Sequence, residues 1–159
     1  IIAGAYWLRR PTASTQTVIA YAGTVAPEAL DAMRQLDAAG RDCALLAITS
    51  YDRLHAGWNA ATRARRNGNT HTTSHIENLL APLSRDCSIV TVLDGHPATL
   101  AWLGSVQGNR VIALGVEEFG QTGTIADVYG THGLDAAAIV SAAEALNPGG
   151  RRASHRLAS

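Results

Sequence analysis

The sequence has no excess of charge of either sign, no long apolar run and very little cysteine. Thirteen basic residues balance thirteen acidic ones, so no overall field attracts nucleic acid or an anionic membrane. No apolar segment approaches the ~20 residues that a membrane-spanning helix needs, and no signal peptide is recognisable. We therefore expect neither a nucleic-acid partner nor a membrane partner, and we expect a cytoplasmic location.

Cysteine occurs twice, at Cys43 and Cys87, and both residues stand in apolar segments that have the character of strands. Buried free thiols in a reducing compartment fit this setting better than a disulfide, which needs oxidising surroundings. Neither cysteine has a local basic setting that favours the thiolate. A cysteine nucleophile is therefore not expected.

Catalytic, phosphate-binding and metal-binding motifs are missing as well. The segment 104–108 reads Gly-Ser-Val-Gln-Gly, which lacks the spacing of a Gly-x-Ser-x-Gly elbow, and no Gly-x-Gly-x-x-Gly or phosphate loop occurs. His71 and His75 are four residues apart, but no Cys, Asp or Glu stands at ligand spacing from them. The chain is predicted to contain no catalytic, cofactor-binding or metal-binding residue.

What the sequence does contain is a succession of short apolar runs and helical patterns. At 159 residues, with 47% hydrophobic and 16% charged residues, it suits one α/β domain with a well-covered sheet. Strands are predicted at 1–8, 17–22, 42–49, 88–93 and 110–116, and helices at 27–39, 51–65, 76–83, 98–106 and 136–146. A polar, basic loop is expected at 63–70 and a frayed tail at 147–159. The spacing of strand, helix and strand is that of a parallel crossover.

The segment 114–133, LGVEEFGQTGTIADVYGTHG, follows the last predicted strand. Gly120 and Gly123 permit backbone angles that bulkier residues resist, and the spacing from Thr124 to Asp127 resembles a capping box. Asp135 can cap the final helix. The pattern predicts a strand, a glycine loop, a short helix and a closing helix, and it indicates no chemistry.

The string GVEEFGQTGTIADVYGTHGLDAAAIV resembles the end of the transketolase-like, thiamine-diphosphate-dependent enzymes, although it has Val128-Tyr129 where Leu-Tyr is commoner. Gly4-Ala5-Tyr6 and VTVLDGHPATLAWLGSVQGNRV are most similar to the homodimeric first component of pyruvate dehydrogenase-type complexes. The resemblance covers residues 1–146, which we take as one domain. The absence of an initiator methionine at Ile1 also predicts a piece of a longer polypeptide.

This resemblance implies a three-layer α/β/α fold with a five-stranded mixed, mostly parallel sheet, whose first strand runs antiparallel at an edge. It also implies a third, C-terminal domain that supports the dimer, while the two preceding domains hold thiamine diphosphate and magnesium. The parent enzyme would decarboxylate a 2-oxo acid, pyruvate by resemblance, and pass the acyl group to a lipoyl-bearing acyltransferase. A transketolase proper, which moves ketol units between sugars, and a stand-alone binding or regulatory module remain the alternatives.

Two candidate sites follow from these patterns. The interface with the preceding domains and the homodimer partner is expected at the exposed carboxylates and aromatics of the glycine loop, namely Glu117, Glu118, Phe119, Gly120, Gln121 and Tyr129. If strands 17–22 and 88–93 are neighbours, the helix starts that follow them open a crevice in which backbone amides can bind an anion. The residues of this candidate anion site are Gly23, Thr24, Gly95 and His96. Water at two ordinary helix starts is the competing interpretation.

Overall fold

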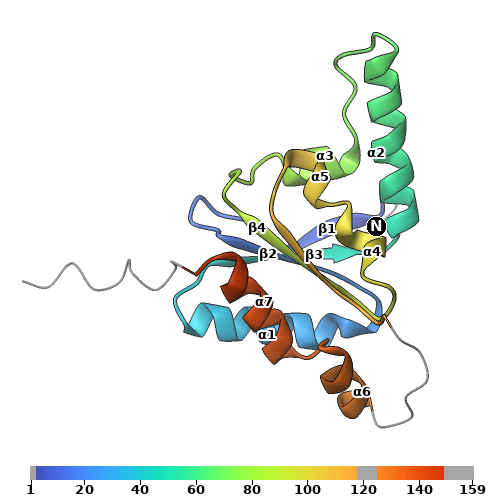
Figure 1. The fold of residues 1–159 in the computed structure, drawn as a ribbon. Coiled ribbons are helices and arrows are strands. Elements are labelled where there is room, and N and C mark those ends of the chain that lie inside the picture. Colours follow the sequence, from blue (N-terminus) through green and yellow to red (C-terminus); the bar gives the residue numbers. More distant parts are fainter. Residues whose placement is uncertain (1–2, 118–124, 149–159) are drawn as a thin grey trace, which may run out of the picture.

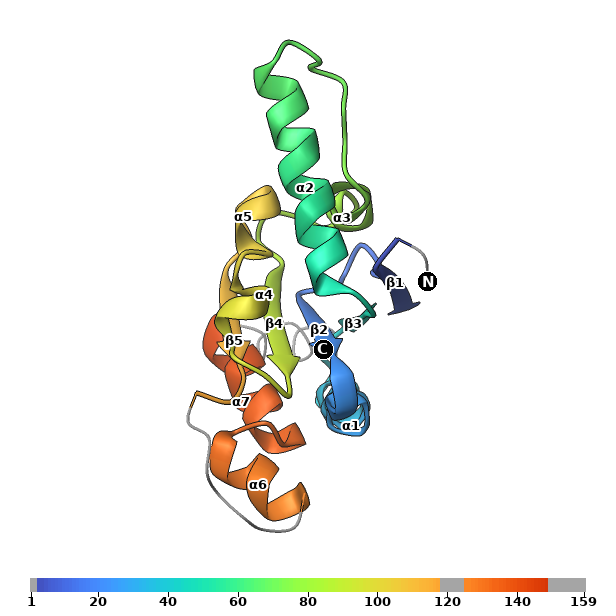
Figure 2. The ribbon, with the colours of Figure 1, turned by 90° about the vertical axis from the view of Figure 1, so that its right-hand side faces the viewer.

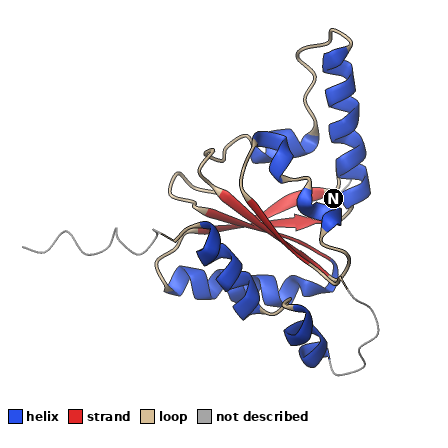
Figure 3. Cartoon of the chain, viewed as in Figure 1, coloured by secondary structure: helices blue, strands red, loops and turns tan. Residues whose placement is uncertain are grey.

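A five-stranded sheet runs through the middle of the protein and separates two layers of helices (Figures 1 and 3). The computed structural model describes residues 3–117 and 125–148 of the chain. The strands lie in the spatial order β1-β3-β2-β4-β5. Their bounds are β1 Ala5–Arg9, β2 Thr17–Ala22, β3 Cys43–Ile48, β4 Ser88–Leu93 and β5 Val111–Leu114. The predicted fold class is confirmed.

The three central strands are covered on both faces, and their composition explains this. Every residue of β3 and β4 is buried, and β2 has a single half-buried residue, Tyr21. Such uninterrupted apolar strands are typical of parallel sheets with helices on both sides. β1 differs, because it pairs antiparallel with β3 at the edge and exposes Tyr6 and Leu8. The expected antiparallel edge strand is therefore present.

The helices form two layers with separate hydrophobic cores. One face of the sheet carries α1 (Ala26–Ala38) and α7 (Ala136–Leu146), which pack against each other, with the short helix α6 (Ile125–His132) beside them (Figure 1). The opposite face carries α2 (Tyr51–Arg66), α3 (His75–Leu80), α4 (Ala98–Ala101) and α5 (Gly104–Gln107). A 3-10 turn, η1 (Gly23–Val25), leads from β2 into α1. The side chain of Asp135 caps α7 as predicted, accepting a hydrogen bond from the amide of Ala138 at 2.8 Å.

Several predicted boundaries are wrong, among them the start of the first strand, which lies at Ala5, the end of α3, which lies at Leu80, and the two that follow. The expected loop at 63–70 begins four residues later, because α2 continues to Arg66. Arg65 stabilises this last turn through an ion pair with Glu77 at 2.7 Å and a hydrogen bond to the carbonyl of Thr72, also at 2.7 Å. The predicted helix at 98–106 is divided into α4 and α5, which are separated by Trp102 and Leu103. The error at 63–70 arose because the contact of Arg65 with Glu77 outweighs the polar character of the local sequence.

Helix α2 and the chain that returns from it project away from the body of the protein (Figures 1 and 2). Of its 16 residues, only Leu54 and Ala61 are buried. Near the middle of α2, Trp58 stacks on Trp102 with ring centroids 5.3 Å apart, which joins α2 to the α4 region. Beyond Trp58, Arg65 joins the outer half of α2 to α3 and to the returning chain through Glu77 and Thr72.

Within the described residues, no helix is long and apolar enough to cross a membrane. Cys43 and Cys87 are buried free thiols, as the sequence predicted. Burial raises the pKa of Cys43 to about 12 and that of Cys87 to about 11, so both remain protonated at neutral pH.

Candidate functional site

The carboxyl edge of the sheet, where the parallel strands end, is the natural place to look for a site. β2 and β4 are neighbours in parallel register, from Thr17 opposite Ser88 to Ala22 opposite Leu93. The chain leaves β2 toward α1 on one face and leaves β4 toward α4 on the other (Figure 1). The two connections therefore diverge at the position where open α/β sheets bind their ligands. The arrangement on which the anion prediction depended is present.

A hydrogen-bonded chain of three side chains crosses this edge. The hydroxyl of Thr24 donates to Oδ2 of Asp94 at 2.9 Å, and the backbone amide of Thr24 lies 3.4 Å from the same oxygen. The hydroxyl of Tyr129, from α6, lies 2.6 Å from the hydroxyl of Thr24. Residues from three separate parts of the chain are therefore linked, and α6 is held against the turn that follows β2.

Glycine at position 23 is what allows Asp94 to approach so closely. Gly23 has φ of +79°, a left-handed conformation that other residues adopt only with strain. A Cβ atom added there would lie 2.1 Å from Oδ1 of Asp94. A similar close approach occurs at Gly115, where an added Cβ would lie 2.4 Å from the carbonyl oxygen of Gly95. The edge is therefore assembled from backbone segments that pack without side chains between them.

The four residues of the predicted anion site do gather here, but a carboxylate of the protein already lies beside them. Asp94 faces the amide of Thr24, and Nδ1 of His96 accepts a hydrogen bond from the amide of Ala98 at 3.2 Å. The nearby segments 22–31, 93–99, 115–117 and 125–136 contain no lysine or arginine. The carboxylates of these segments give them a negative formal charge, which opposes a second anion. Anion binding at Gly23, Thr24, Gly95 and His96 stays a prediction, and Asp94 weakens it.

The predicted interface is described only at its two ends. Glu117 is exposed immediately after β5. Tyr129 is half-buried and packs against the α1/α7 core, with its hydroxyl directed at Thr24. Glu118, Phe119, Gly120 and Gln121 lie outside the described residues. The structure therefore assigns Tyr129 a contact inside its own domain, while Glu117 stands at the surface as expected.

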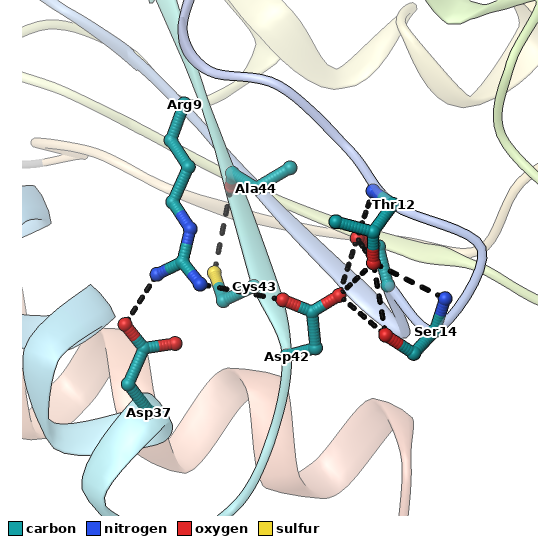
Figure 4. Close-up of polar contacts among 8 residues, drawn as sticks. Arg9, Thr12, Ser14, Asp37, Asp42, Cys43 and Ala44 are labelled. Atoms are coloured by element: carbon teal, nitrogen blue, oxygen red, sulfur yellow. Dashed lines mark hydrogen bonds and ion pairs between the residues drawn. The ribbon is translucent and has the colours of Figure 1, made fainter.

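Sequence reasoning missed the network that closes the opposite, amino edge of the sheet. Asp42, just before β3, accepts hydrogen bonds from the hydroxyls of Thr12, Ser14 and Thr15, and Arg9 pairs with both Asp42 and Asp37 (Figure 4). Burial raises the pKa of Asp42, but the three hydroxyls and Arg9 lower it more, so the net shift is downward. The three hydroxyl residues in the loop before β2 were the signal available in the sequence.

Asn147 is a second unpredicted element of the amino edge. Its side-chain nitrogen lies within 3.2 Å of three acceptors, on Gln16, Thr17 and Ser88. Its Oδ1 accepts from Arg110 and its backbone carbonyl accepts from Arg41, each at 3.2 Å. The predicted tail starts at Asn147. The structure shows that this residue joins the end of α7 to the starts of β2 and β4. Residues 149–159 lie outside the described part of the chain.

Among the described residues, no group of three or more His, Cys, Asp or Glu could hold a metal ion. Nε2 of His75 donates to the carbonyl oxygen of Ala5 at 2.9 Å, so His75 serves the packing of β1 rather than a pair with His71. Asp94, Thr24 and Tyr129 connect segments of the fold. The arrangement is suited to holding surfaces in place.

Comparison with known proteins rests on structure, because no protein-family model and no curated protein matches the sequence. Transketolase from Campylobacter jejuni subsp. jejuni superposes with a TM-score of 0.62 and 18% identity, over 87% of this chain and 18% of that one. Transketolase from Leishmania mexicana gives a TM-score of 0.63 at 15% identity, over 91% of this chain and 18% of that one. A split-gene transketolase, described as an inactive beta4 tetramer, gives a TM-score of 0.61 at 18% identity, over 89% of this chain and 41% of that one.

The chain thus spans less than half the length of each of these proteins. At these identities the likeness concerns the fold. The chain has the five-stranded, three-layer α/β fold that occurs within transketolases, with the antiparallel strand at the sheet edge.

Proposed function

We propose that this chain is the C-terminal, assembly-supporting domain of a thiamine-diphosphate-dependent enzyme. The observation that carries the proposal is the sheet order β1-β3-β2-β4-β5 with an antiparallel edge strand, in a chain that matches transketolases over about nine-tenths of its length. The strings at residues 90–111 and 115–140 support it independently, because they resemble the same enzyme group in sequence. The parent enzyme, by this proposal, is the homodimeric first component of a 2-oxo acid dehydrogenase complex that acts on pyruvate.

A transketolase proper is the second candidate, and the names of the structural neighbours favour it. The strings at residues 4–6 and 90–111, which resemble the dehydrogenase component, favour the first candidate. Both candidates place thiamine diphosphate and magnesium in the parent enzyme and give this domain the same role. The first also implies a lipoyl-bearing acyltransferase as partner and, like the second, a cytoplasmic location.

The described residues of this chain do not fit the cofactor. A diphosphate needs cationic or amide donors, whereas the carboxyl edge presents Asp94 and Glu117 and has no arginine beside them. No cluster of metal ligands is present in the described part of the chain. We therefore assign this domain no step of the reaction. Its role is to support the preceding domains and the homodimer partner.

The first test is a calorimetric titration of the chain with thiamine diphosphate and magnesium. We expect no saturable heat, because the negative carboxyl edge opposes the diphosphate. Saturable binding would give the chain a cofactor site of its own and contradict the assignment of a supporting domain.

The second test mixes the chain with separately produced cofactor-binding domains from the same source. Thiamine-diphosphate-dependent reduction of ferricyanide by pyruvate would identify the dehydrogenase component, and ketol transfer between sugar phosphates would identify a transketolase. A chain that neither binds those domains nor changes their activity would instead be a stand-alone binding module.

A further inference from the structure

The turn that ends helix α2 contains an asparagine followed by a glycine, a pair in which the side-chain amide can be lost spontaneously. Asn67 caps the carboxyl end of α2, and both Asn67 and Gly68 are exposed. A Cβ atom added to Gly68 would meet nothing within 4 Å apart from its chain neighbours. Because glycine carries no side chain to obstruct the approach, its amide nitrogen can reach the side-chain carbonyl carbon of the preceding asparagine.

The reaction at this pair requires only water. The nitrogen of Gly68 forms a bond to Cγ of Asn67, the bond from Cγ to the side-chain nitrogen breaks, and ammonia leaves with the proton of the Gly68 amide. Water then opens the cyclic imide at one of its two carbonyl groups. Opening at Cγ gives aspartate, and opening at the backbone carbonyl gives isoaspartate, in which the main chain passes through the former side chain.

In the folded chain the attacking nitrogen is engaged in a hydrogen bond. The amide of Gly68 donates to the carbonyl of Arg65 at 3.1 Å, and the amide of Asn69 donates to the carbonyl of Ala64 at 3.0 Å. With φ of +96° at Gly68, these two bonds form a Schellman cap at the end of α2. The Gly68 nitrogen therefore cannot lose its proton and turn toward Asn67 until the cap opens.

Opening of the cap depends on the side chain of Arg65, whose carbonyl accepts the hydrogen bond from Gly68. The Arg65 guanidinium forms a bidentate pair with Glu77 at 2.7 and 3.2 Å and donates to the carbonyl of Thr72 at 2.7 Å. Both charged side chains are partly buried, and a bidentate, charge-assisted pair is stronger than an ordinary surface pair. These contacts hold the last turn of α2 against α3 and the returning chain.

We propose that Asn67 is a site of spontaneous deamidation, guarded by the ion pair between Arg65 and Glu77. The modification occurs when the cap opens locally, so its rate follows the population of the open cap. The new carboxylate stands at the carboxyl end of α2, where the helix dipole disfavours negative charge. Isoaspartate also lengthens the main chain inside the cap, so the native bonds cannot form again. The modification is therefore irreversible and keeps the turn open.

This site depends on residues 62–77 of the chain alone. It goes beyond the supporting role proposed above and does not rest on it, so the failure of either leaves the other untouched.

The test is mass spectrometry of the chain after incubation at neutral pH, once in its native state and once unfolded in urea. In the unfolded chain Asn67 should lose its amide faster than Asn69, because Thr70 places a branched side chain beside the attacking nitrogen. In the native chain the rate at Asn67 should be at least about tenfold lower than in the unfolded chain, because the cap is closed most of the time. Equal rates at Asn67 and Asn69 in the unfolded chain, or a native rate as high as the unfolded one, would overturn the proposal.

The variant that addresses the guard is Glu77→Gln. Glutamine keeps an acceptor for the amide of Ser74 at the start of α3 but removes the charge that holds Arg65. The native rate at Asn67 should rise about threefold to tenfold. Glu117→Gln, which removes an exposed carboxylate that follows β5, is the matched control and should leave the rate unchanged. An unchanged rate in Glu77→Gln would also overturn the proposal.

Hydrogen exchange distinguishes local opening of the cap from unfolding of the whole chain. In Glu77→Gln, exchange of the Gly68 amide should accelerate by the same factor as the reaction at Asn67. The amide of Val90, buried in β4, should exchange at the rate of the wild type. Equal acceleration at both amides would show that the variant loses its fold rather than its cap, and it would contradict the guard assigned to Arg65 and Glu77.

Discussion

The two edges of the sheet are built in opposite ways. At the amino edge, Asp42 collects three hydroxyls and an arginine, and Asn147 joins α7 to the starts of two strands. At the carboxyl edge, a single chain of hydrogen bonds through Thr24 connects Asp94 with Tyr129, and both Thr24 and Asp94 are exposed. Polar groups at the amino edge are thus hydrogen-bonded within the domain, whereas those at the carboxyl edge remain accessible to solvent. The amino edge stabilises the fold, whereas the interactions that we propose fall to the carboxyl edge.

The largest expected effect is at Asn147. Replacing it with alanine leaves the buried hydroxyls of Thr17 and Ser88 without their amide partner, so the free energy of unfolding should fall by about 2–3 kcal/mol. Urea unfolding measures this change. Asn69→Ala, at an exposed position in the loop after α2, is the matched control and should change stability by less than about 0.5 kcal/mol. An equal loss of stability in both variants would show that Asn147 does not stabilise the amino edge.

The next effect is the pH dependence that Asp42 gives to the amino edge. Because the pKa of Asp42 is lower in the folded than in the unfolded state, its contribution is fully present above the unfolded value of about 4. The contribution is lost as the pH falls through the lower folded value. Asp42→Asn should reduce stability at neutral pH by about 1–2 kcal/mol.

Urea midpoints measured from about pH 7 down to about pH 3 test this prediction. The wild type and the Asp42→Asn variant should converge in stability as the pH falls. The pKa of Glu77 is also lowered, because its bonds to Arg65 and Ser74 outweigh its burial, so both proteins retain a common acid-dependent loss. A constant difference between the two proteins at every pH would contradict the role assigned to Asp42.

A smaller effect is expected at the carboxyl edge. Asp94→Ala removes an exposed acceptor and should lower the free energy of unfolding by less than about 1 kcal/mol, because water can replace it. Hydrogen exchange of the Thr24 amide should nevertheless accelerate. A stability loss as large as that of Asn147→Ala would erase the difference between the two edges.

The smallest effect concerns the two thiols beside the amino edge. With pKa values raised to about 12 and about 11, Cys43 and Cys87 should react with iodoacetamide at a negligible rate in the native protein at neutral pH. Both should react once the protein is unfolded. Mass spectrometry of alkylated protein before and after addition of urea measures this. Rapid native modification of either thiol would show that the amino edge opens.

The contrast between edges also explains what the sequence allowed us to predict. Apolar runs such as 43–48 and 88–93 indicate buried parallel strands directly, and Asp135 predicts its cap because the partner is three residues away. Asp94 and Thr24 are 70 residues apart, and Asn147 and Thr17 are 130 apart, so their bonds depend on the assembled sheet. The loop predicted at 63–70 was misplaced for the same reason, since Glu77 stabilises the last turn of α2 from outside the helix.

The measurement that tests the account most directly is thiamine-diphosphate-dependent turnover by the intact enzyme, or by the chain mixed with its cofactor-binding domains, when one edge is altered at a time. If the carboxyl edge supports assembly, Asp31→Arg with Glu117→Arg should abolish most of the turnover and yield smaller particles in light scattering. Arg85→Glu at the amino edge should leave both readings unchanged. Turnover that survives the carboxyl-edge change, or that is lost equally with the amino-edge change, would contradict the claim that this domain supports an enzyme through its carboxyl edge.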